Sequence, residues 1–592
     1  MAKLTRRDFL LASAASIGSI VISTSLTGCS SDNDNPEPLP YDVAFLHGVA
    51  CGDPTADALL LWTRVSAEAV EVPVEWQLSA DKEFNQILRS GKTTTSANSD
   101  YTVKIDVQDL AAGTEYFYRF RAGTVYSAAG RGKTLPEGDV SKVKLAVFSC
   151  SNYPAGYFHV YAAAALITDL DAAIHLGDYI YEYGADGYAS EDAQALNRVV
   201  KPATEILALT DYRQRYAQYR TDQALQQIHA AAPFIAVWDD HEITNDAWRD
   251  GAENHQSDEG DYTVRKMAAL QAYFEWMPIR PLRAGDNETI YRQFEFGNLL
   301  NLLMLDTRII GRDQQLQYTA YVDPATGQLD AQRFTADLTQ SNRTMLGTEQ
   351  LQWLQDKLNQ SPARWQMLGQ QVLMGRMLLP GAVALQQLSI PDFAELAALA
   401  QLAGRAQAGD PSLTAEQLAY LQANQHRLTP AVMALLQLPA MPYNLDAWDG
   451  YPTEREIILN AAAAAKKQLL VLAGDTHNGW ANHLDLADGT AVGVELATSS
   501  VTSPGLEQYI NLPDRASAEA TEQALVQLVQ GLQYANLFDR GFMLLTVSPQ
   551  QVDCQWQYVD TIKQAEYQLL EARAKQAVVQ YHADSAARLT LQ

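Results

Sequence analysis

The sequence predicts an α/β (α+β) protein in which a layered α/β domain follows a small all-β domain. From residue 41 to about residue 136, short stretches of alternating apolar and polar residues are separated by turn-rich pieces, which is typical of strands. From residue 143 onward, near-continuous apolar strands alternate with helical stretches, which indicates a sheet covered by helices. A chain of 592 residues is long enough for two or more domains.

The first domain, residues 41–136, is expected to be a small β-sandwich. Its strands are short, and pieces such as Gly52-Asp53-Pro54 mark the turns between them. The segment Gly113-Thr114-Glu115-Tyr116-Phe117-Tyr118 resembles the late strands of a fibronectin type III module. No pattern in this domain indicates catalysis.

The second domain, residues 143–560, supplies strands on which a site could be built. Helical stretches are expected at about 160–166 and 205–232. An Ala-, Leu- and Gln-rich helical insertion is expected at about 391–438, and a polar C-terminal helix at 565–589. The apolar strands lie at 144–150, 172–177, 233–238, 299–305, 365–374, 469–473 and 492–496.

The first 40 residues are interpreted as a processing segment and a tether. Arg6-Arg7 precedes an apolar, Ala- and Ser-rich run, which is the order of a twin-arginine export signal. The run ends in Leu26-Thr27-Gly28-Cys29, which resembles a lipoprotein box with Cys29 as the acylated first residue. Residues 1–28 are then the signal peptide, and residues 29–40 are a polar, proline-broken tether. The alternatives are an ordinary Sec signal and an incidental cysteine.

These features predict export by the twin-arginine route to the periplasm, outer membrane or cell surface. The lipid on Cys29 would be the only attachment to a membrane, since no other stretch is apolar enough to span one. The twin-arginine route exports folded proteins, which suits a cofactor that is loaded in the cytoplasm.

Composition narrows the classes of partner. The formal net charge of −27 argues against nucleic acid and anionic membrane surfaces, and it fits cation binding or simple solubility. Four cysteines are present, and lipidation of Cys29 would leave at most one disulfide among Cys51, Cys150 and Cys554. The protein is therefore not a disulfide scaffold.

Several apolar strands end in polar clusters, and this repetition is the strongest functional signal in the chain. Ligands of layered α/β sheets bind outside the carboxyl ends of the strands, so clusters far apart in sequence are expected to converge on one pocket. The clusters are Cys150, Asp178 with Tyr181, Asp240 with His241 and Asn245, Asp306 with Arg308, and Asp475 with His477.

The cluster at Asp178 indicates a metal ion. A carboxylate at the end of a core strand costs several kcal/mol unless it is paired, and its two oxygens can bridge two cations. Tyr181, three residues on, could supply a phenolate. Because a phenol has a pKa of about 10, ionisation near neutral pH requires a strong Lewis acid such as a trivalent metal. The alternative is that Tyr181 is a packed core aromatic.

Four motifs stand at these strand ends: Phe148-Ser149-Cys150, Gly177-Asp178-Tyr179-Ile180-Tyr181-Glu182, Trp238-Asp239-Asp240-His241-Glu242 and Gly474-Asp475-Thr476-His477. Together they resemble the calcineurin-like metallophosphoesterases, and more closely the PhoD-type alkaline phosphatase/phosphodiesterases. The resemblance covers nearly all of the chain after the leader and includes Gly48-Val49-Ala50-Cys51-Gly52-Asp53-Pro54 in the first domain. It implies a four-layer αββα metallophosphoesterase sandwich behind the β domain.

The resemblance implies iron(III) and one or two calcium ions. Carried over by motif, the iron ligands are Cys150, Asp178, Tyr181 and His477, with Asp178 bridging to calcium. Asn245 and Asp475 lie on the calcium side. The oxygen-rich, histidine-poor set agrees with calcium rather than zinc, as do Gln370 and Gln371, which stand roughly where the broader superfamily has a metal-binding histidine.

The residues themselves leave some roles open. Asp240 is a ligand or supports one, and Asn245 is a ligand or a helix cap. His241 faces phosphate, acts as an acid or base, or is a satisfied core histidine. Arg308 clamps phosphate bidentately or forms a structural ion pair. Asp449 and Tyr451 are expected at the mouth of the pocket.

The sequence thus predicts an exported metal-dependent hydrolase of phosphomonoesters and/or phosphodiesters, with phosphate acquisition as its role. Bound cations would stabilise charge on the phosphoryl oxygens and lower the pKa of an attacking water, with His241 assisting the leaving oxygen. One alternative is a phospholipase D-like diesterase, and another is a catalytically silent calcium- and phosphate-binding surface lipoprotein. The small phosphate ester is the expected partner. The insertion and the C-terminal helix are candidate lids.

Overall fold

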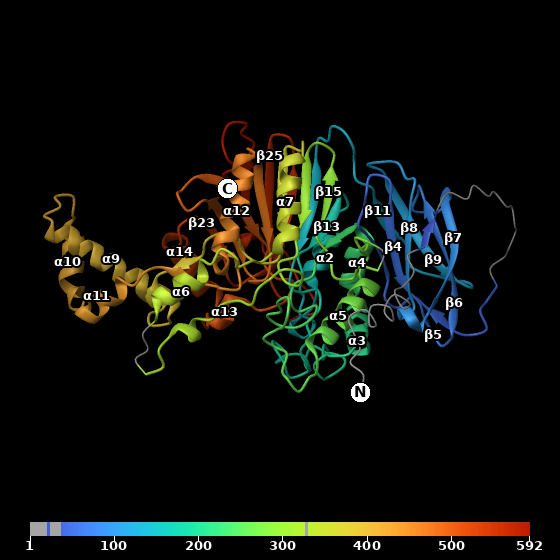
Figure 1. The fold of residues 1–592 in the computed structure, drawn as a ribbon, viewed down its shortest axis with the longest axis horizontal. Coiled ribbons are helices and arrows are strands. Elements are labelled where there is room, and N and C mark those ends of the chain that lie inside the picture. Colours follow the sequence, from blue (N-terminus) through green and yellow to red (C-terminus); the bar gives the residue numbers. More distant parts are fainter. Residues whose placement is uncertain (1–20, 24–36, 284, 326–328) are drawn as a thin grey trace.

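The computed structural model describes residues 21–23, 37–283, 285–325 and 329–592. Figure 1 shows the β domain at one end, a layered α/β body in the middle and a helical arm at the other end. The predicted leader, Cys29 and most of the tether lie outside the described residues, apart from a short strand, β1 (Val21–Ser23). Within the described residues, no helix is long and apolar enough to cross a membrane.

The N-terminal domain is all-β, as predicted. Its core lies between two sheets, and alternation along β9 turns Tyr116, Tyr118 and Phe120 inward. One sheet contains β3 (Val49–Gly52), β4 (Leu59–Arg64) and β8 (Thr102–Val107). The other contains β6 (Glu71–Ser79), β7 (Ile87–Ser96), β9 (Glu115–Ala122), β10 (Val125–Tyr126) and β11 (Gly130–Lys133).

The body contains two large sheets. The first has the order β1-β8-β4-β3-β14-β13-β12-β24-β25-β26-β27, with β12 (Val143–Phe148), β13 (Ala172–His175) and β14 (Phe234–Ala236) parallel at its centre. β24 (Arg540–Val547) and β25 (Gln551–Val559) follow antiparallel. The second has the order β15-β16-β17-β20-β22-β21-β23. Its strands are β15 (Arg292–Phe296), β16 (Leu300–Met304), β17 (Trp365–Gly369), β20 (Gln468–Ala473), β21 (Gly479–Asp485), β22 (Ala491–Ala497) and β23 (Leu532–Asn536).

Along the strands of the second sheet, successive residues pack against the two layers on its opposite faces. On β20, Leu470 and Leu472 join the core shared with the first sheet, whereas Leu469 and Val471 pack with α7 (Gly347–Gln360) and α12 (Pro452–Ala464). Helices α2 (His159–Ala165), α3 (Leu209–Tyr219), α4 (Gln223–Ala231) and α5 (Tyr262–Trp276) cover the first sheet. The predicted four-layer αββα sandwich is confirmed.

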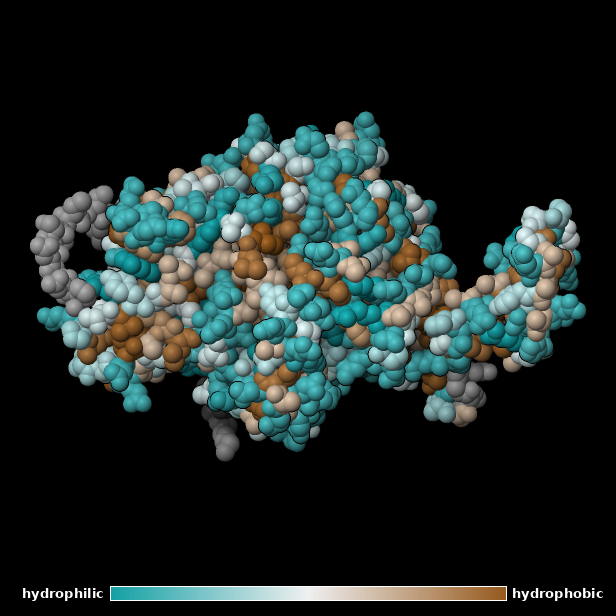
Figure 2. Space-filling view, turned by 180° about the vertical axis from the view of Figure 1, so that it is seen from behind, coloured by the Kyte–Doolittle hydropathy of each residue, from teal (hydrophilic) through white to brown (hydrophobic). Residues whose placement is uncertain are grey.

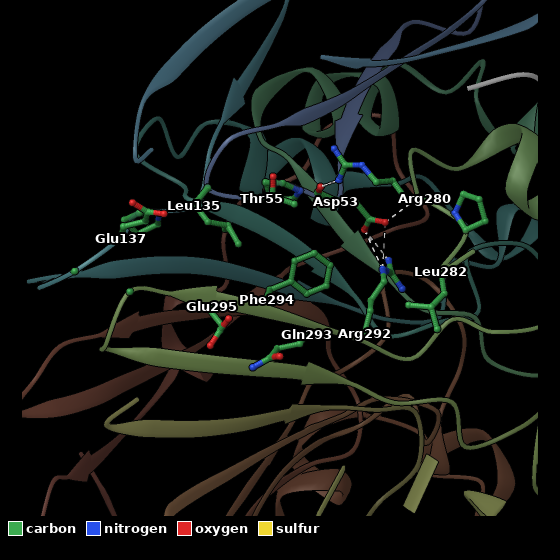
Figure 3. Close-up of a pocket in the computed structure, with 16 residues that line it drawn as sticks. Asp53, Thr55, Leu135, Glu137, Arg280, Leu282, Arg292, Gln293, Phe294 and Glu295 are labelled. Atoms are coloured by element: carbon green, nitrogen blue, oxygen red, sulfur yellow. Dashed lines mark hydrogen bonds and ion pairs between the residues drawn. The ribbon is translucent and has the colours of Figure 1, made fainter. Parts of the chain in front are cut away.

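The β domain is joined to the body through its sheet. Gly52 of β3 pairs with Phe234 of β14, and a Cβ at Gly52 would lie 2.0 Å from the carbonyl oxygen of Pro278, so only glycine fits. The next residue, Asp53, accepts hydrogen bonds from the Arg292 side chain at 2.8 Å and from the backbone N–H of Arg280 at 2.7 Å (Figure 3). This buried carboxylate holds the two domains together.

The helical insertion is confirmed and projects as an arm from the body (Figures 1 and 2). It consists of α9 (Ile390–Gln407), α10 (Ala415–Asn424) and α11 (Pro430–Leu436). The hydroxyls of Ser389, Thr414 and Thr429 cap the amino ends of these helices. The root of the arm is formed by α8 (Gly381–Ala384) and by the hairpin of β18 (Leu378–Leu379) and β19 (Met441–Pro442).

The predicted C-terminal helix at 565–589 is wrong. That segment contains a 3₁₀ turn at Glu571–Arg573, the strand β26 (Lys575–Gln580) and, just beyond, β27 (Leu589–Leu591). Strand β26 pairs with β25, and Val579 lies opposite Val552. Val578 and Val579 are β-branched and gain burial as strand residues at the sheet edge, which outweighs the helical propensity of the polar residues around them. This segment therefore forms no helical lid.

Candidate metal centre

The loops after four strands bring the predicted site residues together. Cys150, Asp178, Asp475 and His477 all adopt left-handed backbone conformations, with φ between 56° and 64°. Such a conformation is costly for residues other than glycine, and it concentrates at functional sites. The N–H of Cys150 donates to the Gly177 carbonyl at 3.1 Å, so the loop after β12 is fixed to the loop after β13.

Glu242 fixes the next pair of loops. Its buried carboxylate accepts hydrogen bonds from the backbone N–H groups of Asp178 at 3.0 Å, Tyr179 at 2.6 Å and Asp239 at 2.8 Å. Burial raises the pKa of Glu242 to about 8; the charge of Asp178 adds to this effect, and the N–H donors oppose it. The sequence motif contains Glu242 but gave no sign of this positioning role.

Cys150, Asp178, Tyr181 and His477 form one candidate ligand group. Ligand atoms of Cys150, Asp178 and His477 lie within 4.8 Å of one another. The Tyr181 hydroxyl donates to Asp178 Oδ2 at 2.9 Å and lies 3.2 Å from His477 Nε2. Burial raises the pKa of Tyr181 well above its ordinary value, and the charge of Asp178 adds to the effect, so ionisation of the phenol would need a strong cation at this position.

The surroundings of this group fit a metal ion. His477 Nδ1 lies 2.5 Å from the Pro504 carbonyl oxygen, which can only accept, so Nδ1 carries the proton and Nε2 is left as the ligand atom. Among the described residues, Asp178 Oδ1 is buried and has no hydrogen-bond partner. Asp178 Oδ2 lies 3.9 Å from His477 Nε2. A carboxylate with one orphaned oxygen, grouped with a thiol and an imidazole, is an arrangement that a cation would satisfy.

A second group shares the same pocket. Asp178, Asp240 and His241 converge, as do Asp239, Asp240 and Asp475. The pocket is a cavity of about 270 Å³ whose lining includes Asp178, Asp240, His241, Asn245, Asp246, Asp446, Asp475 and His477.

Asn245 is not a helix cap. Its backbone N–H donates to Glu182 at 2.9 Å, its side-chain amide donates to Glu253 at 3.1 Å, and the next helix, α5, is capped by Asp261 instead. With the N–H groups engaged, the amide oxygen of Asn245 is the atom available to a cation.

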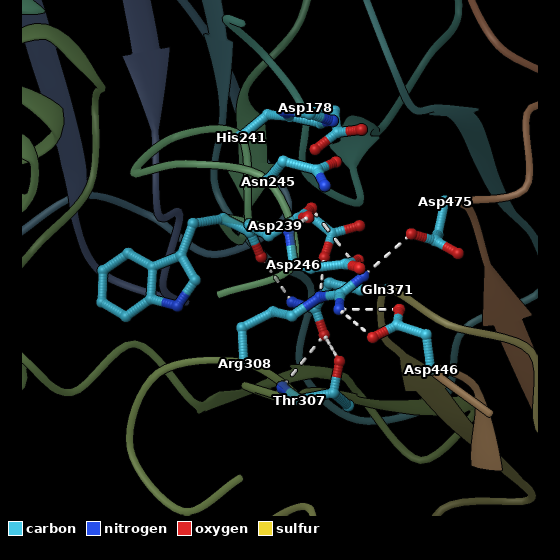
Figure 4. A network of polar contacts seen from close by, with 12 residues as sticks. Asp178, Asp239, His241, Asn245, Asp246, Thr307, Arg308, Gln371, Asp446 and Asp475 are labelled. Carbon is cyan, nitrogen blue, oxygen red and sulfur yellow. Dashed lines mark hydrogen bonds and ion pairs between the residues drawn. The ribbon is translucent and has the colours of Figure 1, made fainter. Parts of the chain in front are cut away.

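Arg308 lies at the centre of the carboxylates (Figure 4). Its side chain is fully buried; it pairs with Asp239, with Asp446 at 2.7 Å, with Asp475 at 2.8 Å and with Asp240 at 3.7 Å. The geometry thus matches the ion-pair interpretation of Arg308 and leaves its guanidinium no free edge for phosphate. With Arg312, which pairs with Asp446, it offsets only part of the negative charge of the site.

His241 is held by a buried carboxylate. Its Nδ1 lies 2.7 Å from Glu182 Oε2, and its ring stacks on Tyr181 with centroids 4.2 Å apart. Burial lowers the pKa of His241, but the charges of Glu182, Asp178 and Asp240 outweigh it and raise this pKa well above its ordinary value. His241 therefore carries a proton at Nε2 while these carboxylates are unneutralised.

Three predicted positions have structural partners instead. Gln371 accepts from Thr307 and donates to the carbonyls of Trp238 and Leu305, and Gln370 accepts from the Trp448 indole. Asp306 accepts from the backbone N–H groups of Arg308 and Ile309. All three are fully buried and lie outside the lining of the pocket, and they fix the strand ends.

The predicted position of Asp449 and Tyr451 at the mouth of the pocket is wrong. Asp449 is buried and accepts from the N–H of Met377 at 2.8 Å, and the Tyr451 hydroxyl donates to the Asp313 carbonyl, so neither is at the mouth of the pocket. Asp446, three residues earlier, lines the pocket instead. Asp239, Asp246, Glu182 and Tyr188 were likewise not singled out. Asp239 and Glu182 stand inside the quoted motifs, and Asp246 and Tyr188 lie within a few residues of them, which is the sequence signal that could have found them.

Comparison with known proteins identifies the family. The PhoD-like phosphatase family matches residues 145–556, and the PhoD-like phosphatase N-terminal domain matches residues 30–136. The chain belongs to the PhoD-like phosphatases. It is 32% identical over 534 residues to alkaline phosphatase D of Bacillus subtilis (strain 168), covering 87% of this chain and 78% of the relative. The solved structure of PhoD superposes with a TM-score of 0.70 at 28% identity, over 92% of both chains.

Membership of this family makes the chain a hydrolase of phosphoric ester bonds. Of the strand-end clusters that the sequence singled out, Asp178, Asp240, His241, Asn245, Asp475 and His477 line one pocket of this phosphatase, together with Asp446. Cys150 and Tyr181 do not line the pocket but contact its residues, since Cys150 is grouped with Asp178 and His477 and Tyr181 donates to Asp178. Asp306 and Arg308 support the pocket.

Replacing Glu242 by Gln tests its positioning role. The amide NH₂ would face one of three backbone donors, so we expect about 2 kcal/mol lower stability and a 10- to 100-fold loss of metal affinity, on the order typical of supporting residues. Metal content after dialysis measures the loss of metal affinity, and the midpoint of thermal unfolding measures the loss of stability. Glu83→Gln, at an exposed position of the β domain, is the control. Unchanged metal content in Glu242→Gln would contradict the role.

Asp449 gives a prediction on pH. Burial raises its pKa to about 6, above the ordinary value of 3.8, so the unfolded chain releases the proton first as pH rises. The contribution of Asp449 to the free energy of unfolding is therefore fully present below pH 3.8 and is lost as pH rises through about 6. Relative to wild type, Asp449→Asn should gain about 3 kcal/mol between pH 3 and pH 7, measured by denaturant unfolding at each pH. A difference in free energy of unfolding between Asp449→Asn and wild type that stays constant across this range would contradict the prediction.

Proposed function

We propose that this PhoD-like phosphatase is an exported, metal-dependent enzyme that hydrolyses phosphomonoesters and/or phosphodiesters with iron(III) and one or two calcium ions. The observation that carries the proposal is that Asp178 belongs to two ligand groups. One group offers the Cys150 thiol and the His477 imidazole, with the Tyr181 phenol hydrogen-bonded to Asp178. The other offers the carboxylates of Asp178 and Asp240 with the His241 imidazole, and a third group adds Asp239 and Asp475 to Asp240.

The donor chemistry supports two different cations. Cys150, Tyr181 and His477 would hold iron(III), because thiolate and phenolate ligands require a strong Lewis acid to ionise at neutral pH. Asp240, Asn245 and Asp475 would hold calcium, which prefers oxygen ligands. When bound, such ions stabilise charge on phosphoryl oxygens and make water a stronger nucleophile.

The protein's own residues orient the substrate and move the proton. His241 lines the pocket with Nδ1 held by Glu182, so Nε2 is the ring nitrogen left to give a proton to the oxygen that leaves phosphorus when His241 is protonated. Arg308 acts as a positioning residue, because it fixes Asp239, Asp446 and Asp475 rather than presenting a free edge to the pocket.

The proposal includes export and attachment by lipid. The arginine pair at Arg6-Arg7 and the box ending in Cys29 support the twin-arginine route and a lipid-anchored protein of the periplasm, outer membrane or cell surface. An exported phosphatase of this kind would release phosphate from esters outside the cytoplasm, which is the reason for proposing phosphate acquisition.

Turnover of chromogenic esters tests the proposal. The metal-loaded protein should hydrolyse p-nitrophenyl phosphate, bis(p-nitrophenyl) phosphate or both, and a chelator should abolish the activity. Asp475→Asn should lower kcat/KM by at least about 100-fold, since it removes a ligand. Asp485→Asn, on β21 away from the pocket, is the matched control.

Two other results would favour one of the alternative functions instead. Release of headgroups from phosphatidylcholine vesicles, without hydrolysis of soluble esters, would establish the phospholipase D-like alternative. Binding of calcium and phosphate without turnover of any ester would contradict an enzymatic role and favour the silent lipoprotein.

A further inference from the structure

An apolar groove opens beside the metal-site pocket. It has a volume of about 780 Å³ and lies between the root of the helical arm and the segment formed by α13 (Leu506–Tyr509) and α14 (Arg515–Leu528). Leu379, Leu388 and Ile390 contribute from the arm side, and Leu512 and Leu525 from the opposite side. A cavity of this size and character is typical of a site for an organic ligand.

The groove is continuous with the pocket. Tyr443, Asn444, Leu506 and Tyr509 line both. These residues come from the two walls: Tyr443 and Asn444 follow β19 at the root of the arm, and Leu506 and Tyr509 belong to α13. A ligand held in the pocket would therefore extend into the groove without crossing a solvent gap.

The polarity changes sharply at this boundary. The pocket is lined by five aspartates, Asp178, Asp240, Asp246, Asp446 and Asp475. Among the described residues that line the groove, none carries a formal charge, although the chain as a whole is strongly acidic. Such a junction matches a molecule with a charged head and an apolar tail.

Apolar side chains also remain accessible at the groove. Tyr509 is 68% exposed and Ile510 38% exposed, and both line it. When a ligand covers large apolar residues that are exposed at a concave surface, the complex is stabilised by roughly 25 cal/mol for each Å² of apolar surface removed from water. Figure 2 shows apolar surface where the arm meets the body of the molecule.

We propose that the groove binds the apolar organic group of a phosphate ester whose phosphate lies in the metal-site pocket. This inference rests on the proposed function and narrows its substrate class to esters that carry an alkyl or aryl group. In the reaction, water attacks phosphorus, the P–O bond to the leaving alcohol breaks, and the leaving oxygen takes up one proton. The root of the helical arm then contributes to substrate specificity.

Alkylphosphonates of increasing chain length provide the test. Their P–C bond is not hydrolysed, so calorimetry on the metal-loaded protein reports binding alone. We expect affinity to rise about two- to fourfold for each added methylene until the groove is filled. A parallel series of p-nitrophenyl alkyl phosphodiesters keeps one leaving group while the alkyl chain grows, and kcat/KM should rise in the same manner. Phenylalkylphosphonates of equal carbon number separate aryl from alkyl preference.

Substitutions in the groove test whether the dependence on chain length arises there rather than from non-specific hydrophobic binding elsewhere on the protein. Leu388→Asp and Ile510→Asp should flatten the dependence on chain length. Leu418→Asp makes the same change at a 46% exposed leucine on α10 that does not line the groove, and it should keep the wild-type dependence.

The outcomes separate the two proposals. Turnover of the methyl ester with no dependence on chain length overturns the groove and leaves the phosphoesterase intact. Binding that tightens with chain length, without turnover of any ester, supports the groove and overturns the enzymatic proposal. Failure of every phosphonate to bind, with no turnover, overturns both.

Discussion

An excess of buried negative charge is the constraint on which the rest of this structure depends. Asp178, Asp239 and Asp240 are buried and Asp475 is half-buried at the ends of strands that are otherwise apolar, and the buried Arg308 pairs with Asp239 and Asp475. Buried carboxylates in such numbers are stable only when cations and hydrogen-bond donors offset them. The two sheets bring the strand ends to one edge, and a bound metal would complete the charge balance.

The scaffold fixes this cluster through the backbone rather than through the ligands alone. Cys150, Asp178 and His477 have left-handed conformations, and their ligand atoms lie within 4.8 Å of one another. Glu242 joins the loops after β13 and β14. Gly177 is required where the two loops touch, since a Cβ there would lie 2.4 Å from the backbone nitrogen of Asp239. Local strain is thereby offset by hydrogen bonds between neighbouring loops.

The sequence was informative where local pattern and burial agree. Apolar strands ending in Asp178, Asp240 and Asp475 could be recognised, and so could their convergence, because strand ends of a parallel sheet meet at one edge. It failed where tertiary contacts decide. Lys575–Gln580 forms a strand because β25 offers it a partner. Asp446 rather than Asp449 lines the pocket, because Asp449 lies in the 3₁₀ helix Trp448–Gly450 and is held by the N–H of Met377. The role of Glu242 depends on three backbone donors that no spacing reveals.

Metal analysis of the purified protein, combined with its visible spectrum, tests the central claim most directly. The account predicts iron together with calcium, and a phenolate-to-iron charge-transfer band that Tyr181→Phe abolishes while Tyr183→Phe, beside His241, retains it. Zinc as the sole metal, or an active protein without metal, would contradict the two ligand groups that share Asp178 and the function built on them.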